Sequence, residues 1–152
     1  MYDVKADVIQ ALRSTCVALP ALLPIVLAKP ASIPSADPGS WSAVEVICHL
    51  RDSEETALQR TRMMRDQDDP HIAGYDQAAL ALQRDYAASQ ADHALSAFLA
   101  FRRQHTDELD RLNLAEWNRP GEHSEYGRIT ILEHAQHLVA HDLIHLAQLA
   151  AI

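Results

Sequence analysis

Hydrophobic residues recur at alternating steps of three and four near the start of the chain, which is the spacing of an amphipathic helix in a bundle. This pattern predicts a first helix over residues 3–27, which Pro20 and Pro24 should bend or end early. The residues expected to face the core are Ile9, Leu12, Cys16, Leu19, Leu23 and Val26.

Two capping boxes predict where later helices begin. Ser42-Ala-Val-Glu45 follows a loop rich in Pro, Ser and Ala at residues 29–40, and it opens a second helix that runs to Arg65. Thr130-Ile-Leu-Glu133 opens the last helix, which runs to the end of the chain. In each box a side-chain oxygen accepts a hydrogen bond from a free backbone N–H group of the first turn.

The segment between these helices predicts one more long helix and two connections. Residues 67–88 are too long for a tight turn and indicate a crossover, with a short helix between Tyr75 and Tyr86. A third long helix is expected from Ser89 to Leu112, followed by a loop at 113–128. Strand-like alternation of useful length is absent, so the chain is expected to form an all-α four-helix bundle as a single domain over residues 1–152.

Size and charge narrow the classes of function. A chain of 152 residues can bury one proper core, and a formal net charge of −8 argues against nucleic acid as the main partner. Neither a membrane-spanning run nor a signal peptide is expected from the sequence. The two cysteines, Cys16 and Cys48, show no paired spacing, which indicates a reducing, cytoplasmic setting. A small-molecule substrate fits these limits.

Histidines cluster in the last predicted helix. His134, His137, His141 and His145 share one helical face, and the last two lie one turn apart on the apolar stripe, where a bundle normally has leucine. A buried imidazole without a partner is costly, and a divalent cation can supply that partner. We therefore interpret His141 and His145 as two ligands of a metal ion, with His134 and His137 at its boundary.

A third ligand is expected from the second helix. His49 lies on its inward stripe with Ser53 and Ala57, about 10 Å from the start of that helix. If the second and last helices are antiparallel neighbours, His49 comes level with His141 and His145. A lone His49 would otherwise be interpreted as a core histidine that is satisfied by hydrogen bonds.

Two well-known histidine motifs do not fit. His141-Asp-Leu-Ile-His145 resembles the zinc-protease motif, but Asp142 replaces its catalytic glutamate and a downstream third ligand is missing. A di-iron carboxylate bundle needs paired Glu-x-x-His motifs, and none of the glutamates in this chain has a histidine three residues later.

Two segments resemble one known family. Trp41-Ser-Ala-Val-Glu45-Val-Ile-Cys-His49-Leu50-Arg-Asp52-Ser-Glu54 is similar to the second-helix signature of the DinB-like (YfiT-like) metal-binding bundles of the DinB superfamily. His137-Leu-Val-Ala-His141-Asp142-Leu-Ile-His145-Leu-Ala-Gln148 is similar to their last-helix signature. The two motifs agree with the family in spacing, order and helix position, and the resemblance spans residues 41–152.

The resemblance implies a bundle of up-down-down-up topology, often a homodimer, with one divalent metal held by three histidines. These positions correspond to His49, His141 and His145. Some relatives are enzymes that use bacillithiol or mycothiol as cosubstrate, either S-transferases or isomerases. In some isomerase relatives a carboxylate is one of the ligands, whereas all three are histidines in this chain.

The expected function is therefore metal-dependent thiol transfer to small electrophiles, with Zn, Ni, Fe or Mn as the ion and a low-molecular-weight thiol as cosubstrate. Three neutral ligands leave the ion its full charge, which lowers the pKa of a bound thiol or water. A metal-dependent hydrolase and a non-catalytic, metal-stabilised dimerisation module are the alternatives. A fourth ligand at His137 would favour the module, since structural ions usually have closed shells.

Four further side chains have expected roles near the ion. His137, Asp142 and Asp52 are expected to orient the ligands through hydrogen bonds, although both aspartates could equally form surface ion pairs. Arg102, near the inward face of the third helix, could hold an anionic group of the substrate.

Overall fold

The protein was analysed as a computed structural model, which describes residues 3–30 and 38–152. Its long helices begin and end within two residues of the predicted positions, because the apolar stripes and the capping boxes both fall where the sequence puts them. These helices are α1 (Val4–Leu27), α2 (Ala43–Asp66), α4 (Ala91–Arg111) and α6 (Ile131–Ala151).

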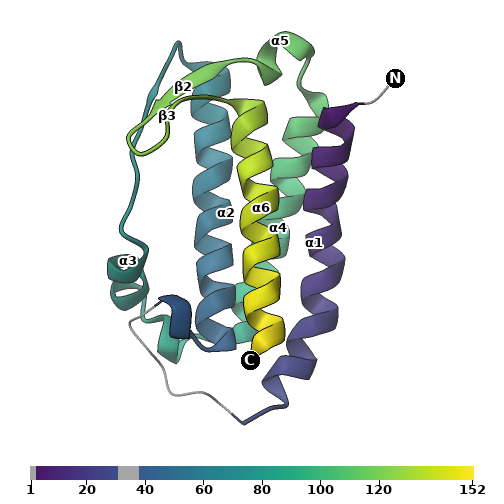
Figure 1. Ribbon diagram of the computed structural model, residues 1–152, viewed down its shortest axis with the longest axis vertical. Helices are drawn as coiled ribbons and strands as arrows, with labels where there is room; N and C mark the ends of the chain where they lie inside the picture. Colours follow the sequence, from purple (N-terminus) through teal and green to yellow (C-terminus); the bar gives the residue numbers. More distant parts are fainter. Residues whose placement is uncertain (1–2, 31–37) are drawn as a thin grey trace.

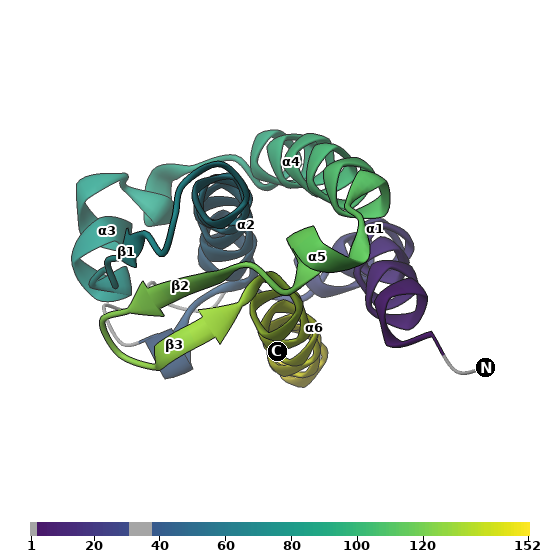
Figure 2. The same cartoon turned by 90° about the horizontal axis from the view of Figure 1, so that it is seen from above.

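The four long helices form a bundle with the predicted topology. α1 and α6 run in one direction, and α2 and α4 run in the other (Figure 1). Each helix packs against two neighbours, in the order α1–α4–α2–α6 around the bundle (Figure 2). The sequence therefore goes up, down, down and up, and the long connection crosses over between the two parallel helices α2 and α4. The all-α four-helix bundle is confirmed.

Local signals explain most of the helix ends. Both predicted capping boxes are present, at Ser42 with Glu45 and at Thr130 with Glu133. The expectation that prolines might end α1 early is wrong, since the helix continues through Pro20 and Pro24 to Leu27. Residues on the inner side of this last part of α1 are buried in the core, and their packing outweighs the hydrogen bonds that proline removes. The buried residues are Leu19, Leu23 and Val26.

The connections contain short elements. The crossover between α2 and α4 holds β1 (His71–Ile72), α3 (Gln77–Gln83) and a 3₁₀ turn at Tyr86–Ala88, close to the predicted short helix. The segment between α4 and α6 holds α5 (Leu114–Trp117), β2 (Pro120–His123) and β3 (Gly127–Thr130). Of the predicted loop at 29–40, residues 31–37 lie outside the described residues, and a 3₁₀ turn occupies Pro38–Ser40.

The expectation that the chain has no strands is wrong. β2 pairs with β1 in parallel and with β3 in antiparallel orientation, and the resulting sheet lies beside α2 and α6, near the end where α2 finishes and α6 begins (Figures 1 and 2). β1 has 2 residues and the other two strands have 4 each, too few to show a period of two. Gly121 packs closely against the side chains below it: a Cβ atom there would lie 2.7 Å from Ile72 Cδ1, so that side chain would have to shift.

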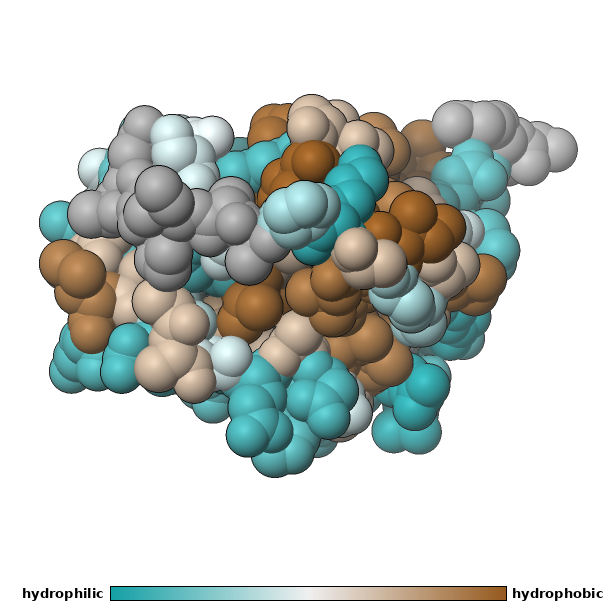
Figure 3. All heavy atoms as spheres, turned by 90° about the horizontal axis from the view of Figure 1, so that it is seen from below, coloured by the Kyte–Doolittle hydropathy of each residue, from teal (hydrophilic) through white to brown (hydrophobic). Residues whose placement is uncertain are grey.

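The core consists of two apolar clusters with a polar layer between them. One cluster surrounds Leu19, Ile47 and Phe98, and the other surrounds Leu12, Met64 and Ile131. Seen from the end at which α1 and α6 finish, the surface shows apolar side chains across its middle and hydrophilic ones around much of its edge (Figure 3).

The polar layer takes one buried residue from each long helix: Thr15, Glu54, Arg102 and Asp142. Arg102 Nη2 forms ion pairs with Glu54 Oε2 at 2.7 Å and with Asp142 Oδ1 at 3.0 Å, and Thr15 donates its hydroxyl to Asp142 Oδ2 over 2.6 Å. His105 Nδ1 lies 2.8 Å from Glu54 Oε1. Burial costs these charges their hydration, so the layer depends on this mutual compensation.

One helix is apolar enough to be considered as a membrane span. α1 meets that criterion by length and composition, with a mean hydropathy of 1.5 over an 18-residue window. Core helices of bundles meet the same criterion, and α1 packs against both α4 and α6. A single helix of this kind does not indicate a membrane protein.

Candidate metal centre

The start of α2 positions His49. Glu45 donates its backbone N–H to Ser42 Oγ over 3.4 Å, and Ser42 donates its own to Glu45 Oε2 over 2.8 Å. His49 follows one turn later on the buried side of α2, with its ring 5.1 Å from that of Trp41 between centroids. Only 2% of His49 is exposed, so the core holds this ring in place.

α6 brings two further histidines to the same level. His141 and His145 lie one turn apart, with ring centroids separated by 4.4 Å. Because α2 and α6 are antiparallel neighbours, the first part of α2 lies beside the last part of α6. His49 therefore faces both rings, at centroid distances of 5.0 Å from His141 and 4.6 Å from His145.

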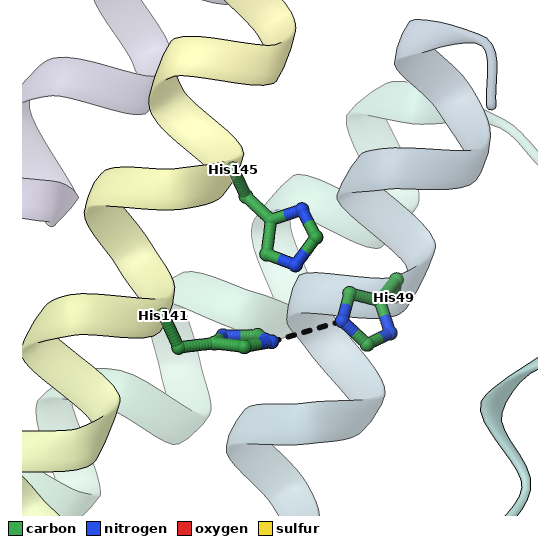
Figure 4. A group of neighbouring side chains, drawn as sticks. All are labelled: His49, His141 and His145. Atoms are coloured by element: carbon green, nitrogen blue, oxygen red, sulfur yellow. Dashed lines mark hydrogen bonds between the residues drawn. The ribbon is translucent and has the colours of Figure 1, made fainter. Parts of the chain in front are cut away.

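The three rings converge on one point. His49 Nε2 and His141 Nε2 are 2.9 Å apart, and one ligand atom from each of the three histidines lies within 4.8 Å of the others (Figure 4). The structure thus brings together the three histidines that the sequence analysis singled out. Within residues 3–30 and 38–152, no other group of three or more His, Cys, Asp or Glu residues has this geometry.

The chemistry of this histidine triad (His49, His141 and His145) fits a metal ion. Burial, and after it the neighbouring imidazoles, lower the pKa of His49 and of His141 to about 3, and burial also lowers the pKa of His145. All three rings are therefore neutral near pH 7, the form in which imidazole binds metals. His49 Nδ1 is buried without a hydrogen-bond partner among the described residues. Such a donor set could hold a divalent transition-metal ion.

Gln148 is a residue of this site that the sequence analysis did not assign a role. His145 Nδ1 lies 2.8 Å from Gln148 Oε1, and Gln148 Nε2 donates to the backbone oxygen of Pro38 over 2.8 Å. Because the amide oxygen can only accept, the ring proton of His145 is on Nδ1 and Nε2 keeps its lone pair free. The sequence does contain a signal for this contact, because residues three apart on a helix, such as His145 and Gln148, lie on the same face.

Asp142 and Arg102 do not have the roles that were expected. Asp142 points into the polar layer, where it accepts hydrogen bonds from Arg102 and Thr15. Because it is only 3% exposed, Asp142 is not a surface ion-pair partner. Among the described residues it also forms no hydrogen bond with His49, His141 or His145. Arg102 is only 1% exposed and is committed to Asp142 and Glu54, so it does not hold a substrate group.

Neither Asp52 nor His137 is hydrogen-bonded to one of the three rings among the described residues. Asp52 is buried and accepts hydrogen bonds from Arg51, Arg84 and Tyr86, which ties α2 to the crossover. Asp52 thus stabilises the fold: its carboxylate is buried, whereas the Arg84 side chain that pairs with it is 44% exposed, so this ion pair reaches the surface, as the alternative expectation allowed. His137 is exposed on α6 and lies 5.2 Å from the ring of Tyr126, between centroids.

The triad borders a cavity. This space of about 490 Å³ is lined by residues of α2, of the crossover, of the β2–β3 hairpin and of α6. His49 and His141 line one part of it, and the small side chains of Ser53 and Ala57 leave room next to them. Ser53 Oγ lies 3.4 Å from His49 Nε2 and 3.0 Å from the hydroxyl of Tyr75, another residue of the cavity wall. The size is typical of a small-molecule site.

A solved structure shows the same fold. YfiT from Bacillus subtilis superimposes with a TM-score of 0.83, covering 97% of this chain and 84% of its own, at 22% sequence identity. That protein is described as a probable metal-dependent hydrolase with an unusual four-helix bundle topology. At this identity the likeness establishes the bundle and its topology. Comparison with curated proteins gave no match.

The sequence itself establishes the family. The family model of the DinB superfamily matches residues 5–149, which is nearly the whole chain and includes the first helix as well as both motifs of the sequence analysis. The resemblance found in two short segments therefore extends to the entire bundle, and this chain belongs to the DinB superfamily.

Proposed function

We propose that this protein is a metal-dependent thiol S-transferase that acts on small electrophiles, with one Zn, Ni, Fe or Mn ion held by His49, His141 and His145. The observation that carries the proposal is that two rings of the triad line a cavity large enough for a small molecule. A purely structural ion usually has a closed shell of protein ligands and needs no adjoining cavity for a small molecule.

In this proposal some residues of the cavity hold the ion and others leave space for the reactants. When bound, the ion supplies a Lewis acid that lowers the pKa of a thiol or a water molecule. His49, His141 and His145 hold it as neutral ligands, and Ser53 and Ala57 leave space for the reactants. In the transfer step a sulfur–carbon bond forms, the leaving group departs with its bonding electrons, and the thiol proton passes to solvent.

Thiol-transfer assays test this function directly. Turnover is expected with monochlorobimane or a chloronitrobenzene and one of four thiols: bacillithiol, mycothiol, glutathione or coenzyme A. His145→Ala should abolish it because two histidines hold a metal weakly. The matched control is His93→Ala, which changes an exposed histidine on α4 and should keep wild-type activity. Absence of turnover with all four thiols would contradict the proposal.

A hydrolase is the second candidate, because the structural neighbour YfiT is described as a probable metal-dependent hydrolase. The same triad and cavity would serve it, with water in place of the thiol. Hydrolysis of activated esters or amides, lost in His145→Ala and independent of any thiol, would favour it. A homodimer and the non-catalytic dimerisation module stay predictions, and the oligomeric state is measurable by light scattering.

Gln148 should tune the affinity of the metal. Gln148→Leu leaves the Nδ1 proton of His145 without its acceptor, so the ring is free to rotate or change tautomer. We expect the metal to bind about tenfold to a hundredfold more weakly, as measured by competition with a chromophoric chelator. Gln136→Leu is the control, since Gln136 is exposed on the same helix. Equal affinities of both variants would show that the hydrogen bond is irrelevant to the ion.

A further inference from the structure

Arg60 is a cation of the cavity wall without an acidic partner. Among the described residues it forms no ion pair, and its one hydrogen bond runs from Nη2 to the backbone oxygen of Ala73 over 2.6 Å. The guanidinium also lies 5.9 Å from the centre of the Tyr75 ring. A guanidinium has five N–H donors, so most of this group's capacity for hydrogen bonds is available to a ligand.

Arg60 shares its cavity with the metal centre. His49, Ser53, Ala57 and Arg60 line this space from successive turns of α2. Arg60 comes eleven positions after His49, which corresponds to about 16 Å along the helix axis. The cavity therefore has a triad end and a cationic end. A ligand that reaches both must be elongated.

His123 adds a second donor at the cationic end. It lines the same cavity, is only 3% exposed, and stacks on Tyr126 with ring centroids 4.6 Å apart. His123 Nδ1 accepts the backbone N–H of Glu125 over 3.1 Å, which places the ring proton of the neutral imidazole on Nε2. That Nε2 is buried and has no partner among the described residues. A buried donor without an acceptor is costly. A small shift of the ring would expose Nε2 to the cavity, where a ligand could bring the missing acceptor.

Charge considerations favour an anion here. Arg60 and His123 are close enough that the Arg60 charge, after burial, helps to lower the pKa of His123. Glu125, an exposed residue of the cavity wall, acts on Arg60 electrostatically but does not form an ion pair with it in the described structure. The chain as a whole carries a formal charge of −8, which repels anions, so an anionic ligand needs a local site of this kind.

We propose that the cationic end of the cavity is a carboxylate-binding subsite, in which Arg60 and the Nε2–H of His123 hold the carboxylate of an elongated acid. A guanidinium fork matches the two oxygens of a carboxylate. Between the two ends, Ala57, Ile129 and Leu138 line an apolar strip that the middle of the ligand would cross. The carboxylate subsite does not depend on the proposed function. Only the further step, in which the other end of the acid reacts at the triad, rests on that function.

Calorimetric titration with 3-phenylpropionate and with its neutral amide tests the subsite. The acid should bind at least about tenfold more tightly than the amide, which is the usual gain of a charge-assisted pair. Arg60→Met should remove this preference, and Arg60→Lys, which keeps the charge but not the fork, should keep part of it. His123→Phe retains the stacking on Tyr126 and should weaken binding of the acid alone. Arg128→Met is the control, because Arg128 is exposed on β3 and pairs with Asp69 outside the cavity.

Repeating the titration with His141→Ala separates the subsite from the metal. The preference for the acid should persist in this variant. If the preference for the acid is lost in His141→Ala but kept in Arg60→Met, the metal binds the carboxylate and the proposal is overturned. Equal binding of acid and amide, or no binding of the acid at millimolar concentration, overturns it as well. Preference for the acid in a protein that lacks turnover would refute only the proposed function.

Discussion

Replacing Arg102 by methionine should lower the free energy of unfolding by about 3–5 kcal/mol, the usual effect of removing one partner from a buried ion pair. The guanidinium lies between Glu54 and Asp142, and all three residues are at most 3% exposed. Its removal leaves two buried carboxylates with like charge in the middle of the bundle. Urea denaturation monitored by circular dichroism measures the loss.

The neighbouring arginine provides the control. Arg103 lies on the same helix but is exposed, so Arg103→Met should change the stability by less than about 0.5 kcal/mol. Adding Glu54→Gln and Asp142→Asn to Arg102→Met should recover part of the loss, because it removes the unpaired charges. If Arg102→Met is as stable as Arg103→Met, the polar layer contributes little and the two apolar clusters alone hold the bundle together.

The helices could be predicted because their signals are local. The capping boxes at Ser42 and Thr130 and the apolar seam from Ile9 to Val26 depend on residues within a few turns of one another. The strands could not be predicted, since β1 and β2 pair across about fifty residues and each is too short for a periodic pattern. The continuation of α1 beyond Pro20 was also missed, because it depends on packing against other helices.

The candidate site was predictable in part for the same reason. Histidines in a seam are anomalous in any sequence, and the spacing of His141 and His145 together with the position of His49 was enough to suggest that they meet. The partners of Asp142 were not predictable, because helical periodicity does not show which buried charge on another helix it will reach. Arg102 and Asp142 are 40 residues apart, and only the packing of α4 with the other helices brings them together.

The polar layer and the triad share one helix, and this connects stability to the site. Asp142 lies between His141 and His145 in sequence and turns about 100° away from His141 around α6. Its buried contacts with Arg102 and Thr15 hold that side of α6 in the core, which keeps the two histidines facing α2. If the histidines hold an ion, Asp142 would orient them through the helix backbone and not by a direct hydrogen bond.

One divalent ion per chain is expected in the tag-free wild-type protein, and His141→Ala should contain almost none. His141 Nε2 lies 2.9 Å from His49 Nε2, and without His141 the two remaining imidazoles form only a weak site. Elemental analysis of both proteins measures the metal and identifies it. Absence of metal in the wild type, even after reconstitution with Zn, Ni, Fe and Mn, would mean that the triad binds no metal and consists only of polar residues in the core.

The metal content of His137→Ala shows whether His137 is a fourth ligand that closes the coordination shell, or whether one position of the ion stays free. His137 is exposed on the same helix, one turn before His141, and it is not in the group of ligand atoms that lie within 4.8 Å of one another. If three histidines hold the ion, His137→Ala should retain the full metal content and a coordination position stays free for a substrate. If its metal is lost, a fourth ligand closes the shell, and removal of metal by a chelator should then lower the melting temperature strongly. Since His137 lines the cavity but is outside this group of close ligand atoms, we expect the first result, with a coordination position free for a substrate.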